Sequence, residues 1–406
     1  MGLGERETSV RMRLIIFSTD YPPLIGGIST YSYQLARNLV KMNRVTVLAP
    51  HAPGDRAFDA RQPFQTVRVA NVPVLRELLC MTYILWLHAQ ERIDCIVNTV
   101  WFPCGLLSYY LSRVASVRYV VGAYASEMLD DNRSLKRQIK GLLSGFKIKT
   151  FLSASMMLAV SQYTKGKLVE MGCPSEKVMI LNAGVDVGQF CPGAKADALA
   201  RKHGIGKGDL VLLSVGRLDL HKGHDIVLRA LPKILEEVPN LIYLIVGDGP
   251  ERAHLQALAE DYGLSAKVQI IGQVEDEHLV EYYRLCDVFV MPSREIEGRV
   301  DLIEGFGMVF LEANACAKPV IGGLSGGVPD AVLDKETGLL VDPTSPEEVA
   351  AAVILLCKDK AYADKLGHMG LKRCRDVFSW PAICQLLQRV LEKIAGTSEK
   401  GEPAKG

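Results

Sequence analysis

The chain has 406 residues, a length that predicts two globular domains rather than one large core. Apolar residues make up 49% of the chain and charged residues 23%, which excludes a largely disordered protein. The 47 basic and 46 acidic side chains leave a net charge of +1, which gives no whole-protein argument for a nucleic-acid partner. Residues 1–190 carry 22 basic and 14 acidic side chains, or +8, and the remaining 25 and 32 give −7, so the first half is expected to be the more positive.

Short β-branched segments alternate with longer amphipathic segments along the first half, a pattern typical of a parallel α/β domain. The expected strands are Leu14–Thr19, Val45–Ala49, Thr66–Ala70, Cys95–Thr99, Tyr119–Gly122, Met157–Ser161 and Val178–Leu181. These elements predict a Rossmann-like domain over residues 1–187, followed by a polar, glycine-containing linker over 188–208.

The same alternation restarts in the second half and predicts another Rossmann-like domain over 209–379. Its expected strands are Leu210–Gly216, Leu241–Gly247, Val268–Ile271, Val288–Pro292, Pro319–Ile321 and Gly338–Val341. A last helix over 380–395 either finishes this domain or crosses back over the first, and 396–406 is expected to be a flexible tail. Two such domains in tandem place a ligand-binding cleft at the carboxyl ends of both sheets.

The ten cysteines stand singly, without a Cys-x-x-Cys pair, and predict reduced, mostly buried thiols in a cytoplasmic protein. The first ten residues contain no apolar signal core, and the most apolar stretch, Leu78–Leu87, is too short to span a bilayer. The sequence therefore predicts a cytoplasmic protein that is soluble or lies on the inner face of the membrane.

The loop from Thr19 to Ser29 allows a ligand to approach its backbone closely. Pro22 and Pro23 stiffen it, Gly26 and Gly27 remove side chains, and the helix that follows offers free amides to an anion. The same residues also fit a simple strand-to-helix turn. Neither Gly-x-Gly-x-x-Gly nor Gly-x-x-x-x-Gly-Lys occurs in the chain, so dehydrogenase and phosphate-loop ATPase interpretations lose their best support.

Two cations follow the first expected strand of the second domain. Gly216 and Arg217 stand at its carboxyl end and Lys222 at the start of the next helix, so both charges can converge on one anion. A fixed Arg fork with a mobile Lys suits a diphosphate, whereas the alternative is a pair of solvated surface charges.

The run from Glu304 to Glu312 contains a predicted helix start that faces the cleft. Gly305 and Gly307 open this helix, whose first amides stabilise negative charge. The two carboxylates can reach different parts of an extended ligand, or they are a capping acid and a helix-surface acid.

Three motifs occur in a fixed order along the chain, namely Pro22-Pro23…Gly26-Gly27, Gly216-Arg217…Lys222-Gly223 and Glu304-x7-Glu312. Together they resemble the retaining, GT-B-fold glycosyltransferases of glycosyltransferase family four over nearly the whole chain. The stretches 291–294 and 322–332 look most like the phosphatidylinositol mannosyltransferase B branch. The resemblance implies an α/β protein of two Rossmann-like domains that moves a hexosyl unit from a UDP-, GDP- or ADP-linked sugar to a hydroxyl of a glycolipid, polysaccharide or polyol.

The resemblance also implies roles for residues. Its catalytic set is Arg217, Lys222, Glu304 and Tyr124. Its donor contacts are Gly27, Gly216, Arg217, Lys222, Val274, Arg294, Glu304, Gly305, Phe306, Gly307, Met308, Val309 and Glu312. The two cations would neutralise the diphosphate, Glu312 would hold the ribose, Glu304 would hold the transferred sugar, and Val274 and Arg294 would lie near the base.

Acceptor contacts are implied for Gly26, Tyr124 and Glu127. Many relatives have a cleft histidine where this chain has Tyr124, while Glu127 is kept. The tyrosine hydroxyl either replaces the histidine as a hydrogen-bond donor or signals altered activity, and a third interpretation is a Tyr that closes a buried strand.

No Asp-x-Asp pair or metal-ligand cluster is apparent, so we expect a metal-independent reaction without a cofactor. The family resemblance implies a front-face route in which the leaving phosphate takes the acceptor's proton. A nucleotide-sugar 2-epimerase and a non-catalytic nucleotide-sugar-binding protein are the alternatives on the same scaffold.

Residues 133–151 form a basic amphipathic segment that fits either a helix on an anionic membrane or a crossover helix with a solvated basic face. The apolar segment Val74–His88, which contains Trp86, predicts a packed helix rather than an anchor. The sequence does not determine the oligomeric state.

Overall fold

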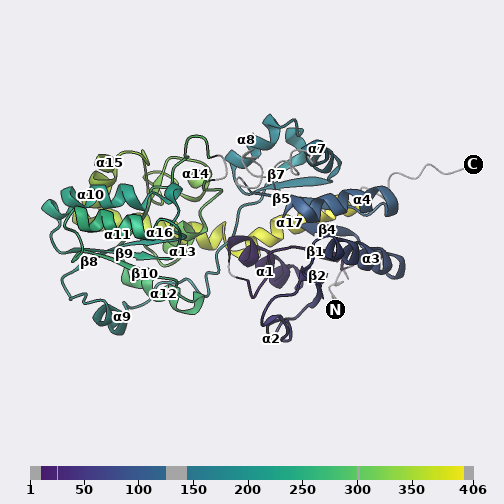
Figure 1. Cartoon of the computed structure of the whole chain (residues 1–406), viewed down its shortest axis with the longest axis horizontal. Coiled ribbons are helices and arrows are strands. Elements are labelled where there is room, and N and C mark those ends of the chain that lie inside the picture. The colour runs from purple at the N-terminus through teal and green to yellow at the C-terminus, as the bar shows by residue number, and fades with distance from the viewer. Residues whose placement is uncertain (1–10, 25, 125–143, 300–301, 397–406) are drawn as a thin grey trace, which may run out of the picture.

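The computed structural model describes residues 11–24, 26–124, 144–299 and 302–396. Within them, two parallel β-sheets with helices on both faces stand side by side (Figure 1). This is the α/β architecture that the alternation of short β-branched and longer amphipathic segments predicts.

The first half contains a seven-stranded sheet in the order β3-β2-β1-β4-β5-β6-β7, with parallel pairing between all neighbours. Its strands are β1 (Arg13–Phe17), β2 (Arg44–Pro50), β3 (Gln65–Val69), β4 (Cys95–Asn98), β5 (Tyr119–Ala123), β6 (Met156–Ala159) and β7 (Val178–Ile180). All seven predicted strands are confirmed. Because β1 lies between β2 and β4, the loop after β1 is at the switch point of the sheet, where ligands bind in open α/β folds.

The helices of the first half cover both faces of this sheet. They are α1 (Gly27–Leu39), α2 (Asp55–Asp59), α3 (Leu75–Gln90), η1 (Trp101–Gly105), α4 (Leu106–Ala115), α7 (Ser144–Ser153), α8 (Gln162–Glu170) and η2 (Ser175–Lys177). α1 packs on one face, while α3, α4 and α7 bury Cys80, Ile84, Leu111 and Phe151 on the other.

The second half contains a six-stranded parallel sheet in the order β10-β9-β8-β11-β12-β13. Its strands are β8 (Leu210–Val215), β9 (Leu241–Val246), β10 (Val268–Gly272), β11 (Val288–Met291), β12 (Val320–Gly323) and β13 (Leu339–Val341). Its helices are η3 (Leu220–Lys222), α10 (His224–Glu237), α11 (Arg252–Asp261), α12 (Asp276–Leu285), α13 (Met308–Ala315), α14 (Val328–Ala331), α15 (Pro346–Lys358) and α16 (Lys360–Asp376). The six predicted strands are confirmed here as well.

The polypeptide crosses between the halves twice. The first crossing includes the predicted linker, but that stretch also contains α9 (Asp197–Lys202), which buries Leu199. His203, directly after α9, contacts Gln269 and the hydroxyl of Tyr282 at 3.0 and 3.2 Å. These contacts attach the later part of the linker to the second half.

The second crossing ends in α17 (Trp380–Gly396), which returns to the first half and packs on α1 (Figure 1). Trp380 meets the ring of Tyr31 edge-on at 5.5 Å, and the amide of Asn43 donates to Gln388 at 2.6 Å. Of the two alternatives for the last helix, the structure therefore has the one that crosses back.

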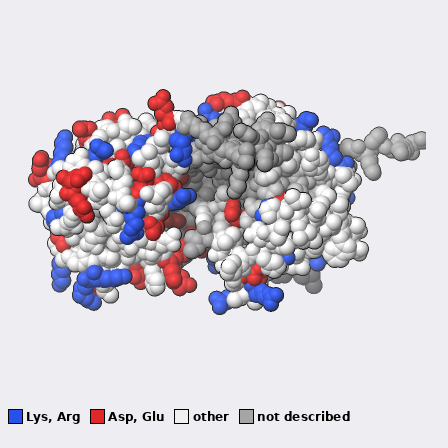
Figure 2. Space-filling view, in the orientation of Figure 1, with Lys and Arg blue, Asp and Glu red and all other residues white. Residues whose placement is uncertain are grey.

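The structure differs from the sequence prediction at α3, which is a helix but is not packed on all sides. Leu75, Leu78 and Trp86 are 47%, 52% and 59% exposed, and Val114 of neighbouring α4 is 78% exposed. In Figure 2 the surface over α3 and α4 carries few charged residues, with Lys and Arg at its border. The periodicity of α3 could not reveal this, because it is apolar on nearly every side.

The predicted basic segment 133–151 is described only from residue 144 onward, as α7. Lys147 is 2% exposed, with its ammonium 5.2 Å from the ring centroid of Trp101. Since this cation is buried, α7 does not present the fully solvated basic face that one of the two interpretations expects.

Candidate active site

A cavity of about 310 Å³ lies between the two halves, as the tandem arrangement predicts. Its walls come from the start of α1, the first crossing over residues 184–190, the end of β8, α12, the start of α13 and Trp380. The carboxyl ends of both sheets therefore contribute to one site.

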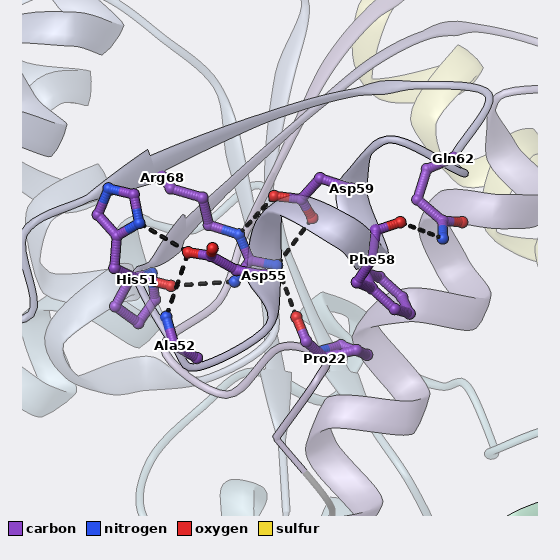
Figure 3. A network of polar contacts seen from close by, with 9 residues as sticks. Pro22, His51, Ala52, Asp55, Phe58, Asp59, Gln62 and Arg68 are labelled. Atoms are coloured by element: carbon purple, nitrogen blue, oxygen red, sulfur yellow. Dashed lines mark hydrogen bonds and ion pairs between the residues drawn. The ribbon is translucent and has the colours of Figure 1, made fainter.

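The loop that leads from β1 into the cavity is held from behind by Arg68 of β3 (Figure 3). The Arg68 side chain is 6% exposed, and its Nε and Nη2 donate to the two carboxylate oxygens of Asp59 at 2.9 and 2.8 Å. It also donates to the carbonyl oxygens of Pro50 and Pro22 at 3.0 and 2.6 Å. Such a bidentate pair fixes both partners, so the loop before Gly27 has a rigid support.

Gly26 and Gly27 line the cavity at the start of α1. A Cβ atom at Gly27 would lie 3.3 Å from Cε of Met308, which belongs to α13 in the other half. The two halves thus approach closely at Gly27, for which the resemblance implies a donor contact.

Lys222 and Glu304 form the central ion pair of the second half. Nζ of Lys222 donates to Oε2 of Glu304 at 2.5 Å, and the two side chains are only 17% and 13% exposed. Burial by itself raises the pKa of Glu304, but the charge and hydrogen bond of Lys222 bring it below its usual value. Glu304 is therefore ionised at neutral pH.

Two histidines beside this pair stay neutral. Burial, followed by the charge of Lys222, lowers the pKa of both His221 and His224 to about 4. The two histidines therefore add no positive charge to this loop at neutral pH, and its cations are Arg217 and Lys222.

The loop that carries Lys222 depends on Gly223, which has φ of 76°. A Cβ atom there would overlap the carbonyl oxygen of Pro292, at the end of β11. Only glycine satisfies both the left-handed backbone and this close approach.

Replacing Gly223 by Ala is expected to lower the free energy of unfolding by about 3 kcal/mol, because backbone strain and steric overlap add. The matched control is Gly263→Ala, since Gly263 has φ of 67° but nothing within 4 Å of the added atom. That variant should lose only about 1–2 kcal/mol. Urea unfolding of both variants measures the difference, and equal losses would show that the contact with Pro292 is unimportant.

The structure reverses the expected roles of Arg217 and Lys222. The side chain of Arg217 is 72% exposed, and its Nε lies 3.2 Å from Oδ2 of Asp219. The sequence predicts a fixed Arg and a mobile Lys, but in the structure Lys222 is held by Glu304 and Arg217 is the exposed cation. Arg217 nevertheless follows Gly216, which lines the cavity.

Arg294, which the resemblance places near the base, is paired with an acid and is not among the residues that line the cavity. Nη1 and Nη2 of Arg294 donate to the two carboxylate oxygens of Asp225 at 2.9 Å each, and both side chains are 11% exposed. Its backbone amide donates to the carbonyl oxygen of His221. Arg294 therefore anchors the loop that carries Lys222 rather than facing a ligand.

α13 begins at the cavity, with Met308 and Val309 in its wall. Gly307 precedes it with φ of 95°, and a Cβ atom there would lie 2.5 Å from the ring of Phe310. The first amides of a helix have no intrahelical acceptor, so this helix start directs hydrogen-bond donors and positive dipole at the cavity.

Glu312, one turn further along α13, also lines the cavity. The hydroxyl of Tyr283 on α12 donates to its Oε2 at 2.6 Å. Burial raises the pKa of Glu312 to about 7, although the hydrogen bond from Tyr283 opposes this shift. Sequence reasoning missed Tyr283, since no local pattern links it to a carboxylate 29 residues later.

The remaining predicted site residues that the structure describes are not among the residues that line the cavity. Gly305 and Phe306 lie in the loop before α13, and the ring of Phe306 packs against Phe378 at 5.6 Å. Val274 follows β10 and packs against the core. Tyr124 follows β5 with its ring edge-on to Tyr31 at 5.7 Å, whereas Glu127 lies outside the described residues.

Within the described ranges, no group of three or more His, Cys, Asp or Glu side chains is placed to hold a metal ion. Nor does any helix in this part of the chain have both the length and the apolar character needed to cross a membrane. All ten cysteines are free thiols, and eight of them are buried.

Comparison with known families gives two matches that together cover most of the chain. The model described as Glycosyltransferase Family 4 matches residues 25–189, and the model described as Glycosyl transferases group 1 matches residues 195–373. The boundary between them falls in the first crossing.

Curated relatives match over nearly their whole length. The chain is 32% identical over 379 residues to the GDP-mannose-dependent alpha-(1-6)-phosphatidylinositol monomannoside mannosyltransferase of Mycolicibacterium smegmatis, covering 90% of this chain and 95% of the relative. It is 33% identical over 389 residues to the Mycobacterium tuberculosis protein of the same name, covering 92% and 97%.

Solved structures share the fold at lower identity. HepE of Anabaena in complex with UDP has a TM-score of 0.78 and 19% identity, covering 94% of this chain and 100% of that one. Sucrose-phosphate synthase of Thermosynechococcus elongatus has a TM-score of 0.76 and 22% identity, with coverage of 95% and 100%.

Proposed function

This chain belongs to glycosyltransferase family four, and from this premise we propose that it transfers mannose from GDP-mannose to a hydroxyl group of an inositol-bearing glycolipid. It is an enzyme that moves a glycosyl unit from a nucleotide sugar to an acceptor. The observation that carries the finer proposal is the nearly full-length similarity to mannosyltransferases whose names state this donor and acceptor.

The donor occupies the cavity between the halves with its diphosphate at the start of α13. Lys222 turns from Glu304 to the phosphates, and the amides of Met308 and Val309 complete the anion site together with exposed Arg217. The partial burial of Lys222, whose side chain is 17% exposed, supports this role, since a cation in a water-poor site stabilises a leaving group more than one in water does.

The two carboxylates hold the hydroxyls at either end of the donor. Glu304 accepts hydrogen bonds from the mannosyl unit once Lys222 has turned to the phosphates, and Glu312 accepts them from the ribose. The support is their placement, with Glu304 beside the predicted phosphate site and Glu312 in the wall of the cavity.

The reaction proceeds on one face of the sugar. The bond between the anomeric carbon and the diphosphate oxygen breaks, its electron pair leaves with GDP, and the acceptor oxygen bonds to the same face. The acceptor's proton passes to the departing phosphate oxygen, so positioning and charge stabilisation supply the catalysis. We therefore assign no protein nucleophile.

No metal ion is required, because Lys222, Arg217 and the start of α13 neutralise the developing charge. Full turnover is expected after exhaustive treatment with a chelator. Strict dependence on added Mg²⁺ or Mn²⁺ would contradict this part of the proposal.

Glu312 makes donor binding dependent on pH. Ribose hydroxyls donate to the ionised carboxylate, so binding releases the proton that Glu312 carries below its pKa of about 7. The affinity for GDP-mannose should therefore level off above pH 7 and fall by about tenfold per pH unit below it. Calorimetry between pH 5.5 and 8.5 measures this, and GDP-mannose is preferable to GDP because it has no terminal phosphate that titrates near pH 6. The same slope in Glu312→Gln would assign it to another group.

The acceptor side belongs to the first half, with Gly26 at the cavity and Tyr124 after β5. Tyr124 lies beside Tyr31, which in turn packs on Trp380 of the returning helix. A phenol hydroxyl donates a hydrogen bond, so Tyr124 takes the place of the cleft histidine of many relatives.

A lipid acceptor brings the enzyme to a membrane surface, and the exposed side of α3 and α4 is the contact. Leu75, Leu78 and Trp86 lie on one side of α3, with Val114 on α4 next to it. An apolar helix side with a Trp is typical of segments that lie in a membrane interface, and Arg113 is on the same helix as Val114.

Sedimentation with vesicles tests this contact. The double variant Leu78→Glu with Trp86→Glu should abolish binding to vesicles that contain anionic lipid. The control Leu355→Glu, at an exposed position of α15 in the second half, should still bind. If the unmodified chain stays in the supernatant at low salt, the membrane contact is wrong, whereas the donor assignment is unaffected.

The proposed reaction is tested by incubating the protein with labelled GDP-mannose and a phosphatidylinositol monomannoside acceptor. We expect a mannosylated lipid from GDP-mannose and little product from UDP- or ADP-linked sugars. Equal transfer from a UDP sugar would contradict the assignment of GDP-mannose as the donor. Release of a 2-epimeric sugar in the absence of an acceptor would identify an epimerase.

A further inference from the structure

We propose that a groove in the first half, distinct from the cleft, binds a ligand that carries phosphate and at least one hydroxyl. The groove has a volume of about 960 Å³ and lies where β1, β2 and β3 begin, with Arg13, Arg44 and Gln65 as the first residues of these strands. The cavity between the halves is at the opposite, carboxyl ends of the same strands. The proposal does not depend on the reaction assigned above.

The groove is lined by cations and, among the described residues, by no carboxylate. Its cations are Arg11, Arg13, Arg37, Lys41 and Arg44. Three acidic side chains lie next to it. Glu91 contacts Arg44 at 2.8 Å and Arg13 at 3.5 Å, Asp186 contacts Arg37 at 3.3 Å, and Asp94 accepts from the backbone amide of Arg13 at 2.8 Å. Five positive charges against three negative ones leave an excess of two that phosphate can neutralise.

A buried amide in the same groove indicates the second part of the ligand. Asn43 is 2% exposed, and its Nδ2 donates to Leu39 and to Gln388 at 3.3 and 2.6 Å. These two acceptors fix the orientation of the amide, and its Oδ1 is buried without a partner. A buried acceptor without a donor is costly, and a ligand hydroxyl satisfies it.

These two features together define the ligand as a phosphorylated polyol. A neutral polyol leaves the excess positive charge without a counter-charge, and an anion without hydroxyls leaves Asn43 unsatisfied. Phe64 and Pro63 in the wall add a small apolar contact. The same chemistry occurs in free polyol phosphates and in the phosphorylated headgroups of inositol lipids, so the experiment needs an arm for each source.

Calorimetry with inositol hexakisphosphate is the first arm, and vesicles of phosphatidylcholine with phosphatidylinositol 4-phosphate are the second. The double variant Arg11→Ala with Arg44→Ala should lower the affinity for whichever probe binds by about tenfold or more, since a charge-assisted contact is lost at each Arg. The matched control is Arg56→Ala with Arg61→Ala, which removes the same charge from exposed positions in the same half. Lys222→Ala should leave binding unchanged, because it alters only the cleft.

Binding of the soluble probe alone assigns the groove to a free polyol phosphate, and binding of the vesicles alone assigns it to a headgroup. The proposal is overturned if neither probe binds, if both double variants weaken binding equally, or if Lys222→Ala abolishes it. Thermal unfolding of each variant verifies that the fold is intact, and the single variant Arg44→Ala replaces the double variant should the latter be unstable.

Discussion

Lys222→Ala is expected to lower kcat by about a hundredfold or more, because it removes the buried cation that stabilises the leaving diphosphate. The Lys222 side chain is 17% exposed and lies 2.5 Å from Glu304, from which it turns to the phosphates when the donor binds. The affinity for GDP should fall as well, since GDP carries the same diphosphate. Steady-state kinetics with GDP-mannose and calorimetry with GDP measure the two effects.

Removal of Lys222 also leaves Glu304 without its partner, so lost activity must be separated from lost stability. The double variant Lys222→Ala with Glu304→Gln removes both charges and should unfold at a higher temperature than Lys222→Ala, yet remain inactive. Lys233→Ala, at an exposed position of α10, should behave as the unmodified enzyme. Recovery of turnover in the double variant would show that Lys222 serves the fold and not the reaction.

Glu304→Gln is expected to lower kcat/KM for GDP-mannose by about a hundredfold while the affinity for GDP changes little. The carboxylate is assigned to hydroxyls of the transferred sugar, which GDP lacks. Glutamine keeps the shape of the side chain and a carbonyl acceptor, but it loses the charge that strengthens these hydrogen bonds.

The contrast between GDP-mannose and GDP is the decisive readout for Glu304. Glu260→Gln, at an exposed position of α11, controls for the loss of one carboxylate elsewhere in the same half. A parallel loss of GDP affinity in Glu304→Gln would instead place this side chain at the nucleotide. Unchanged kcat/KM would remove it from the site altogether.

Most of the fold could be predicted from the sequence because buried parallel strands have a strong local signal. Segments such as Leu210–Val215 and Leu241–Val246 are almost wholly apolar, and both are confirmed as strands. The sequence does not predict whether α17 stays with the second half or crosses back to the first. The choice depends on which half buries Trp380 and Leu387, and in the structure both side chains are buried against the first half.

The motif residues of the site could be predicted by position, but their interactions could not. The glycines around α13 and the cavity position of Glu312 follow from local sequence, because a strand end and a helix start have recognisable residues. The hydrogen bond from Tyr283 to Glu312 joins two helices, and the pairing of Arg294 with Asp225 joins two loops. Such pairs depend on the packed sheets, so the sequence does not predict that Arg294 is paired with Asp225.

The exposed side of α3 and the basic groove also could not be predicted from the sequence. A helix with apolar residues on nearly every side gives no indication of which side lacks a partner. The groove combines residues from the beginnings of β1 and β2 and from the last turn of α1, which come from separate segments of the chain. The excess of positive charge in residues 1–190 did predict a positive surface, but not its place.

A crystal structure of the enzyme with intact GDP-mannose tests the central assignment most directly. We expect the two phosphorus atoms between Nζ of Lys222 and the backbone amides of Met308 and Val309, with the ribose at Glu312 and the mannose at Glu304. A donor whose phosphates lie away from Lys222 and the start of α13 would contradict the proposed chemistry.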